Sequence, residues 1–164
     1  MVTLQVRVGR IPWVLLSYRL PREPSSSRIT LWRKLKRLGV VQLLDGLVAL
    51  PLDSRNREQL EWLADEVVEA GGEAMIWIGE VGSAAHEREL ARRMADAVSA
   101  DYRRLIADAH TASGLAPGQR RRILGRLRRE LHRIRSRDYF PPPEREHAHQ
   151  AVKALAMLVG EAAA

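Results

Sequence analysis

The chain has 164 residues, of which 46% are hydrophobic and none is cysteine. This composition is ample for a packed core and argues against disorder, while the lack of cysteine excludes disulfides, thiolate metal sites and thiol redox chemistry. No apolar run approaches the roughly 18 residues that a membrane-spanning helix needs. Residues 3–8 alternate polar and apolar side chains, unlike a secretory signal peptide. We therefore expect a soluble cytoplasmic protein with no membrane contact.

The positive charge is concentrated in two segments. The net charge is +7, and 24 of the 27 basic residues are arginine. Residues 19–37 and 117–137 carry net charges of +6 and +8, so the rest of the chain is acidic. Two basic patches on an acidic body favour an anionic partner.

The first half of the chain predicts alternating strands and helices. Strands are expected at 13–18, 40–44, 47–50 and 73–81, because short apolar runs there are bounded by turn residues, among them the hairpin dipeptide Asp45-Gly46. Helices are expected over 29–38, with Trp32, Leu35 and Leu38 on the buried stripe, and from Asp53 or Ser54 to Ala70. The order β-α-β-β-α-β predicts a ferredoxin-like α+β domain over residues 11–81, with an antiparallel sheet covered on one face by two helices.

Residues 82–164 predict a helical extension that packs on this domain as one compact unit. Helices are expected over 83–112, over 120–136 and from the prolines at 141–143 to residue 159. Gly and Pro residues at 113–118 separate the first two of these helices.

Three segments resemble a known family. The runs Trp13–Ser25, Arg28–Gly39 and Arg137–Pro141 are similar to motifs of the ChrB amino-terminal domain. The resemblance covers the chain from about residue 11 to its end and implies a role in chromate resistance, most often as a regulator of the transporter operon. It also implies a second, carboxy-terminal domain in full-length members, which we do not expect in this chain. The first half further resembles the middle domain of PaaX-type repressors and the Cas2 nuclease fold, both ferredoxin-like.

The start of the first predicted helix is a candidate oxyanion site. Arg28 is expected on the apolar stripe, one turn before Trp32, where an unpaired guanidinium is costly. A helix N-terminus also favours anions, and the preceding segment adds a second guanidinium and three hydroxyl groups. The predicted oxyanion-binding residues are Arg22, Ser25, Ser26, Ser27 and Arg28. The alternative is that Arg28 pairs with an internal acid such as Asp45 or with a nearby carbonyl, as most such arginines do.

The two basic segments are candidate surfaces for nucleic-acid phosphates. The residues expected to contact phosphates are Arg33, Lys34, Arg37, Arg120, Arg121, Arg122, Arg126, Arg129 and Arg133. In the later helix they surround an apolar stripe formed by Ile123, Leu127, Leu131 and Ile134. The alternative for Arg33, Lys34 and Arg37 is a solvated helix face. The alternative for the arginines of the later helix is pairing with acids of neighbouring helices, such as Asp101 and Asp108. Base-specific readout is not predicted, because the chain has one Asn, five Gln and no evident helix-turn-helix.

No catalytic residue, metal or cofactor is expected. Cas2-type nucleases hold a metal with an Asp just after the first strand, where this chain has Ser17-Tyr18-Arg19-Leu20. His147 and His149 diverge on a helix and do not predict a metal site. The leading hypothesis is a regulatory protein that binds DNA and responds to chromate or a sulfate-like anion. The alternatives are a Cas2-like metal-dependent nuclease and a subunit that docks on an acidic partner; a homodimer is left open.

Overall fold

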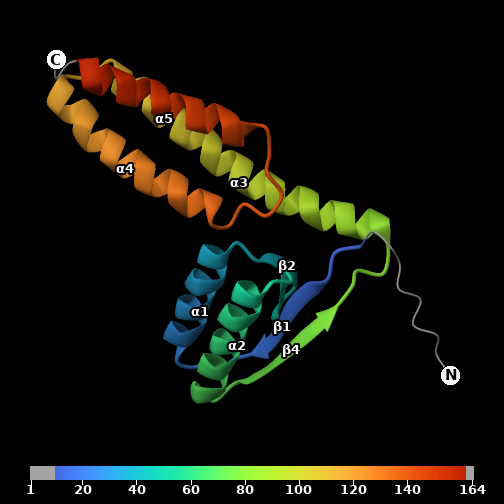
Figure 1. Cartoon of the computed structure of the whole chain (residues 1–164). Helices are drawn as coiled ribbons and strands as arrows, with labels where there is room; N and C mark the ends of the chain where they lie inside the picture. The colour runs from blue at the N-terminus through green and yellow to red at the C-terminus, as the bar shows by residue number, and fades with distance from the viewer. Residues whose placement is uncertain (1–9, 162–164) are drawn as a thin grey trace. The chain divides into compact units, whose positions relative to one another are not determined.

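The computed structural model describes residues 10–161, and Figure 1 shows their arrangement into helices and strands. The elements are β1 (Trp13–Arg19), α1 (Ser25–Leu38), β2 (Val41–Leu44), β3 (Leu47–Pro51), α2 (Ser54–Glu69), β4 (Glu73–Gly79), α3 (Ala84–Ser113), α4 (Pro117–Arg135) and α5 (Glu144–Glu161). This order confirms the predicted α+β class, a β-α-β-β-α-β pattern followed by a helical half. The prediction made for residues 3–8 lies outside the described residues.

The chain divides into two compact units, Met1–Ala91 and Arg92–Ala164, and α3 runs from the first into the second. We call them the sheet unit and the helical unit. The expected boundary near residue 81 and the expected packing of the extension on the first domain stay predictions.

The sheet unit contains four antiparallel strands in the order β2-β3-β1-β4. β1 is central: its Leu15 lies opposite Ala49 of β3 on one side and Trp77 of β4 on the other. Helices α1 and α2 lie on the same face of the sheet, as predicted (Figure 1). Side chains that alternate along β1 and β3 are buried together with apolar side chains of the two helices: Val14, Leu16, Val48, Leu50, Leu31, Leu35, Leu60, Leu63 and Val67.

The hairpin between β2 and β3 turns at Asp45-Gly46, as the dipeptide predicts. Gly46 has a φ of 73°, and its carbonyl accepts a 2.7 Å hydrogen bond from the N–H of Tyr18. A Cβ at this position would lie 2.4 Å from the carbonyl oxygen of Tyr18. The turn therefore requires glycine both for its backbone conformation and for the close approach of β1.

Helix α1 begins earlier than predicted and buries a different stripe. It starts at Ser25, so the three serines form its first turn instead of the end of a loop. Leu31 and Leu35 are buried, whereas Trp32 is 36% exposed, and the prediction that Trp32 faces inward is wrong. The two leucines lie four residues apart and set the inward direction, from which Trp32 is rotated by about 100°. Its ring instead lies under the ammonium of Lys36, 5.4 Å from the centroid.

The helical unit has a core of three helices, α3, α4 and α5, that lie side by side (Figure 1). Its buried side chains are Val98, Tyr102, Leu105, Ala109 and Ala112 from α3, Leu124, Leu127, Leu131 and Ile134 from α4, and Ala148, Val152 and Leu155 from α5. The stripe predicted for α4 is confirmed except that Leu124 is buried and Ile123 is only partly so. Between residues 10 and 161, no helix is both long and apolar enough to cross a membrane.

Candidate anion-binding and nucleic-acid surfaces

The predicted oxyanion segment lies at the start of α1, with Arg28 on the surface. Its Nη2 donates a 3.0 Å hydrogen bond to the carbonyl of Arg22. This is the kind of carbonyl contact that the structural alternative expects. Because Arg28 is exposed, it also escapes the cost of an unpaired buried guanidinium. No contact within the chain tests whether an oxyanion binds to the segment, and that prediction stays open.

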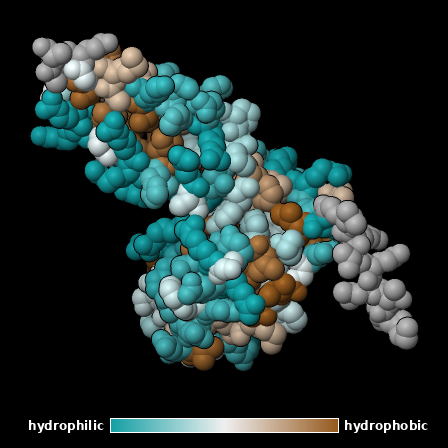
Figure 2. Space-filling view, in the orientation of Figure 1, coloured by the Kyte–Doolittle hydropathy of each residue, from teal (hydrophilic) through white to brown (hydrophobic). Residues whose placement is uncertain are grey.

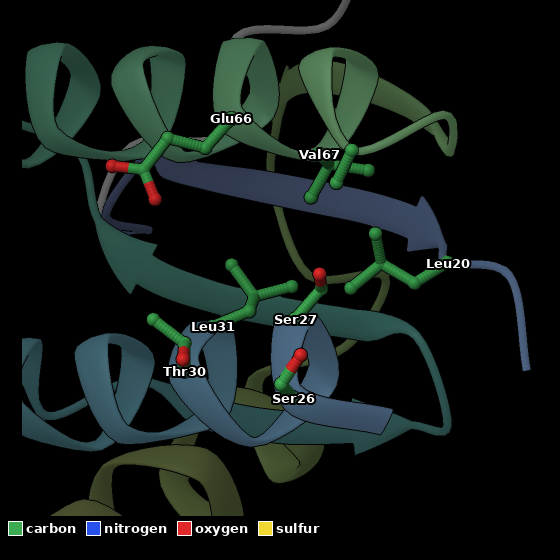
Figure 3. Close-up of a pocket in the computed structure, with 8 residues that line it drawn as sticks. Leu20, Ser26, Ser27, Thr30, Leu31, Glu66 and Val67 are labelled. Carbon is green, nitrogen blue, oxygen red and sulfur yellow. The ribbon is translucent and has the colours of Figure 1, made fainter. Parts of the chain in front are cut away.

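A pocket of about 200 Å³ opens between α1 and α2, beside this segment (Figure 3). It is lined by Leu20, Ser26, Ser27, Thr30, Leu31, Glu66, Val67 and Ala70, so two serines of the predicted site reach it and the two arginines do not. The carboxylate of Glu66 accepts from Nζ of Lys34 at 2.7 and 2.6 Å. A pocket whose only charged lining group is a carboxylate is poorly suited to a dianion.

The basic residues of α1 differ in their contacts. Lys34, predicted to meet phosphate, is held by Glu66. Arg37 donates from Nε to the carbonyl of Arg33 at 3.4 Å, and both side chains are exposed. Neither arginine forms an ion pair with any residue between 10 and 161. Arg33 and Arg37 are thus the two predicted phosphate contacts of α1 without an ion pair among the described residues, and phosphate binding by all three stays a prediction.

Helix α4 carries a row of arginines opposite its buried stripe. Arg122, Arg126, Arg129 and Arg133 follow one another at intervals of three or four residues, so they share one face, and all four are exposed. We call them the α4 arginine row. The row is about 16 Å long, given the helical rise per residue. In Figure 2 the outer side of α4 is almost entirely hydrophilic.

One member of the row has an acidic partner. Arg126 pairs with Asp108 at 2.9 Å, through side chains that are 56% and 48% exposed. A pair so exposed contributes little to stability, so Arg126 can exchange Asp108 for a phosphate at small cost. The other three members form no ion pair within the described residues. Pairing with neighbouring acids, the alternative considered for this helix, therefore accounts for one arginine of the row.

The two arginines that precede the row have different surroundings. Arg120 is partly buried and donates from Nε to the carbonyl of Leu115 at 2.8 Å and from Nη1 to that of Leu158 at 3.3 Å. It thus connects the α3–α4 turn to α5, which its position in a run of arginines does not reveal. Arg121 is exposed on the flank of the row.

The loop between α4 and α5 is fastened to α3 by two adjacent residues. Arg137 pairs with Asp101 at 2.5 Å, and Asp138 accepts a 2.7 Å hydrogen bond from the hydroxyl of Tyr102. Tyr102 is fully buried, and none of the Asp138 side chain is exposed. Burial, followed by the hydrogen bond to Asp138 and the charge of that carboxylate, holds the pKa of Tyr102 well above its ordinary value, so the phenol stays protonated and donates. Sequence reasoning treated this loop only as a family motif.

The end of β1 holds an ion pair where a Cas2-type nuclease would place its metal-binding acid. Arg19 donates from Nη2 to Glu73 of β4 at 2.8 Å. Across the part of the chain that the structure describes, no three His, Asp or Glu side chains gather as a metal site.

The comparisons with known proteins agree on one family. The family model described as "Protein ChrB, N-terminal" matches residues 28–114, which extend from the first turn of α1 to the end of α3. Protein ChrB of Cupriavidus metallidurans is 30% identical over 133 residues, which is 79% of this chain but 40% of that protein. No solved structure gives a significant match. The likeness to the PaaX middle domain and to Cas2 stays a prediction.

Proposed function

This chain belongs to the family of the ChrB N-terminal domain, and on that premise we propose that it is a regulator that binds DNA phosphates through α4 and responds to chromate or a similar oxyanion. Membership of this family supports a role of the chain in chromate resistance. Regulation, DNA binding and oxyanion binding are proposals that go beyond family membership. The chain spans only 40% of the length of the relative it matches, so the activity of that whole protein does not carry over.

The α4 arginine row is the observation that carries the DNA part of the proposal. Phosphates of one DNA strand follow each other at about 3.4 Å along the axis, so a row of about 16 Å spans roughly five of them. Guanidinium groups bind phosphate oxygens in a bidentate manner. A surface that serves solubility alone intersperses both signs of charge, whereas α4 carries eight arginines and a single acid, Glu130.

A salt titration tests this proposal. In the variant Arg122→Gln/Arg129→Gln/Arg133→Gln, binding to duplex DNA should weaken alike for all sequences. The slope of log affinity against log salt should become shallower by nearly three, because each lost phosphate contact removes about 0.9 from it. The matched control removes three exposed arginines that already pair with acids, in Arg57→Gln/Arg103→Gln/Arg104→Gln. It should change the slope much less.

Two outcomes would contradict the proposal. An unchanged slope in the α4 variant would mean that the row does not meet phosphate. An equal change in the control would mean that net charge, not the row, governs binding. The row also fits an acidic protein surface; for that alternative, binding to the partner would persist in the presence of excess competitor DNA.

A further inference from the structure

A second pocket lies in the helical unit, where the end of α4 meets the start of α5. Its volume is about 190 Å³, and its lining residues are Leu131, Arg135, Arg145, Glu146 and His149. We call it the Arg135–Arg145 pocket. Neither arginine is among the site residues predicted from the sequence, and neither belongs to the α4 arginine row.

The pocket combines two guanidinium groups whose charge is only partly offset by nearby carboxylates. Arg135 forms no ion pair with the described residues. The carboxylate oxygen closest to Arg145 is Oδ2 of Asp138, 3.8 Å from Nη1, which is longer than a hydrogen bond. The one carboxylate in the lining, Glu146, accepts a 2.6 Å hydrogen bond from Gln150. Among the lining residues, two guanidinium groups stand against one carboxylate, and the imidazole of His149 adds a further donor. Asp138 lies outside the lining and offsets part of the charge of Arg145.

A buried pair of side chains stands behind Arg145. The hydroxyl of Tyr102 holds Asp138 at 2.7 Å, and the carboxylate of Asp138 in turn faces Arg145. Because Tyr102 and the side chain of Asp138 are both shielded from solvent, Arg145 is oriented by a fixed charge. Its remaining N–H groups are left for a ligand. A preorganised cation binds an anion at a lower entropic cost than a free surface arginine does.

We propose that the Arg135–Arg145 pocket binds a small tetrahedral dianion of the chromate, sulfate and phosphate class. Its volume is several times the roughly 30 Å³ of one water but below the about 300 Å³ at which pockets for larger organic ligands begin. The size therefore favours an inorganic oxyanion over a nucleotide. The inference extends the proposed function by naming a site for the anion. It rests on that function only for the statement that the bound anion regulates the protein.

Calorimetric titration of the whole chain tests the site. Sodium sulfate, chromate, phosphate and perchlorate are titrated at constant ionic strength into wild type, Arg145→Gln, Arg135→Gln, Arg128→Gln and Arg28→Ala. The three dianion-forming salts should bind wild type, and tetrahedral but monovalent perchlorate should bind more weakly. Arg145→Gln and Arg135→Gln should each lower the dianion affinity by about tenfold or more, because each removes a charge-assisted contact.

The remaining variants are controls. Arg128→Gln removes the same charge from an exposed site on α4 and should bind sulfate as wild type does. Loss of binding in Arg28→Ala alone would assign the anion to the start of α1 and overturn the proposal. Equal losses in Arg128→Gln and Arg145→Gln would overturn it as well, because binding would then follow net charge. Thermal melts without anion show whether each variant is folded. Because DNA binding is measured separately through the α4 row, failure of either proposal leaves the other standing.

Discussion

The hydroxyl of Tyr102 donates a 2.7 Å hydrogen bond to Oδ2 of Asp138, 36 residues further along the chain. The other carboxylate oxygen of Asp138 is buried without a hydrogen-bond partner among the described residues. A buried carboxylate with so few donors depends on each of them. Together with the Arg137–Asp101 pair, Tyr102 therefore holds the α4–α5 loop on α3, and it orients the carboxylate that faces Arg145.

Tyr102→Phe should lower the free energy of unfolding by about 1–3 kcal/mol, the range for a hydrogen bond whose loss leaves a buried charged group without its donor. Chemical denaturation measures the change. In a double-mutant cycle with Asp138→Asn, the two effects should be strongly non-additive, because the substitutions remove the same contact. Additive effects would show that the hydrogen bond does not contribute to stability.

The same pair predicts a loss of stability at alkaline pH. The pKa of Tyr102 is raised in the folded chain, first by burial and then by Asp138, whereas an unfolded tyrosine titrates at about 10. The contribution of Tyr102 to the free energy of unfolding is therefore complete below about pH 10. It is lost as the pH rises above that value, because the unfolded chain then releases a proton that the folded chain retains. Denaturation midpoints measured between pH 8 and pH 11 should fall less in Tyr102→Phe than in wild type. Parallel curves would contradict this.

The parts of the fold that sequence predicted correctly depend on local signals. Asp45-Gly46 defines the hairpin by its own backbone preferences. Asp53 caps α2 by accepting from the N–H of Asn56 at 2.6 Å, three residues away. The sequence predicts the wrong buried stripe for α1 because Leu31 and Trp32 are adjacent and both apolar. Only packing on the sheet decides which of the two is buried.

The site was harder to predict because its contacts are distant in sequence. The α4 arginine row is a pattern within one helix, and its spacing can be read directly. The Arg135–Arg145 pocket instead depends on a loop residue, Asp138, that meets Tyr102 on another helix. A local pattern does not contain such a pairing. The one signal in the sequence is the Arg137–Pro141 motif, which indicates the family but not this contact.

Gly46→Ala should destabilise the sheet unit by more than about 1 kcal/mol. A left-handed φ already disfavours alanine, and the added Cβ would lie 2.4 Å from a backbone oxygen that cannot move without displacing β1. Gly82→Ala serves as a control, since nothing lies within 4 Å of its Cβ position. Equal stability of the two variants, measured by chemical denaturation, would show that the hairpin has another conformation.

Arg120→Gln and Arg121→Gln should separate structure from DNA binding at neighbouring positions. Arg120 donates to the carbonyls of Leu115 and Leu158, so its loss should cost about 1 kcal/mol or more of unfolding free energy by leaving two partly buried acceptors without this donor. Arg121 is exposed, and its loss should change stability by no more than about 0.5 kcal/mol. On DNA the order reverses: Arg121→Gln should reduce the salt slope by about 0.9, because its exposed side chain is expected to contact a phosphate, whereas Arg120→Gln should leave the slope unchanged. Denaturation curves and salt titrations on the same two proteins provide both comparisons. Equal stabilities would mean that the two carbonyls do not need Arg120, and a reduced slope in Arg120→Gln would place that arginine on the phosphate surface after all.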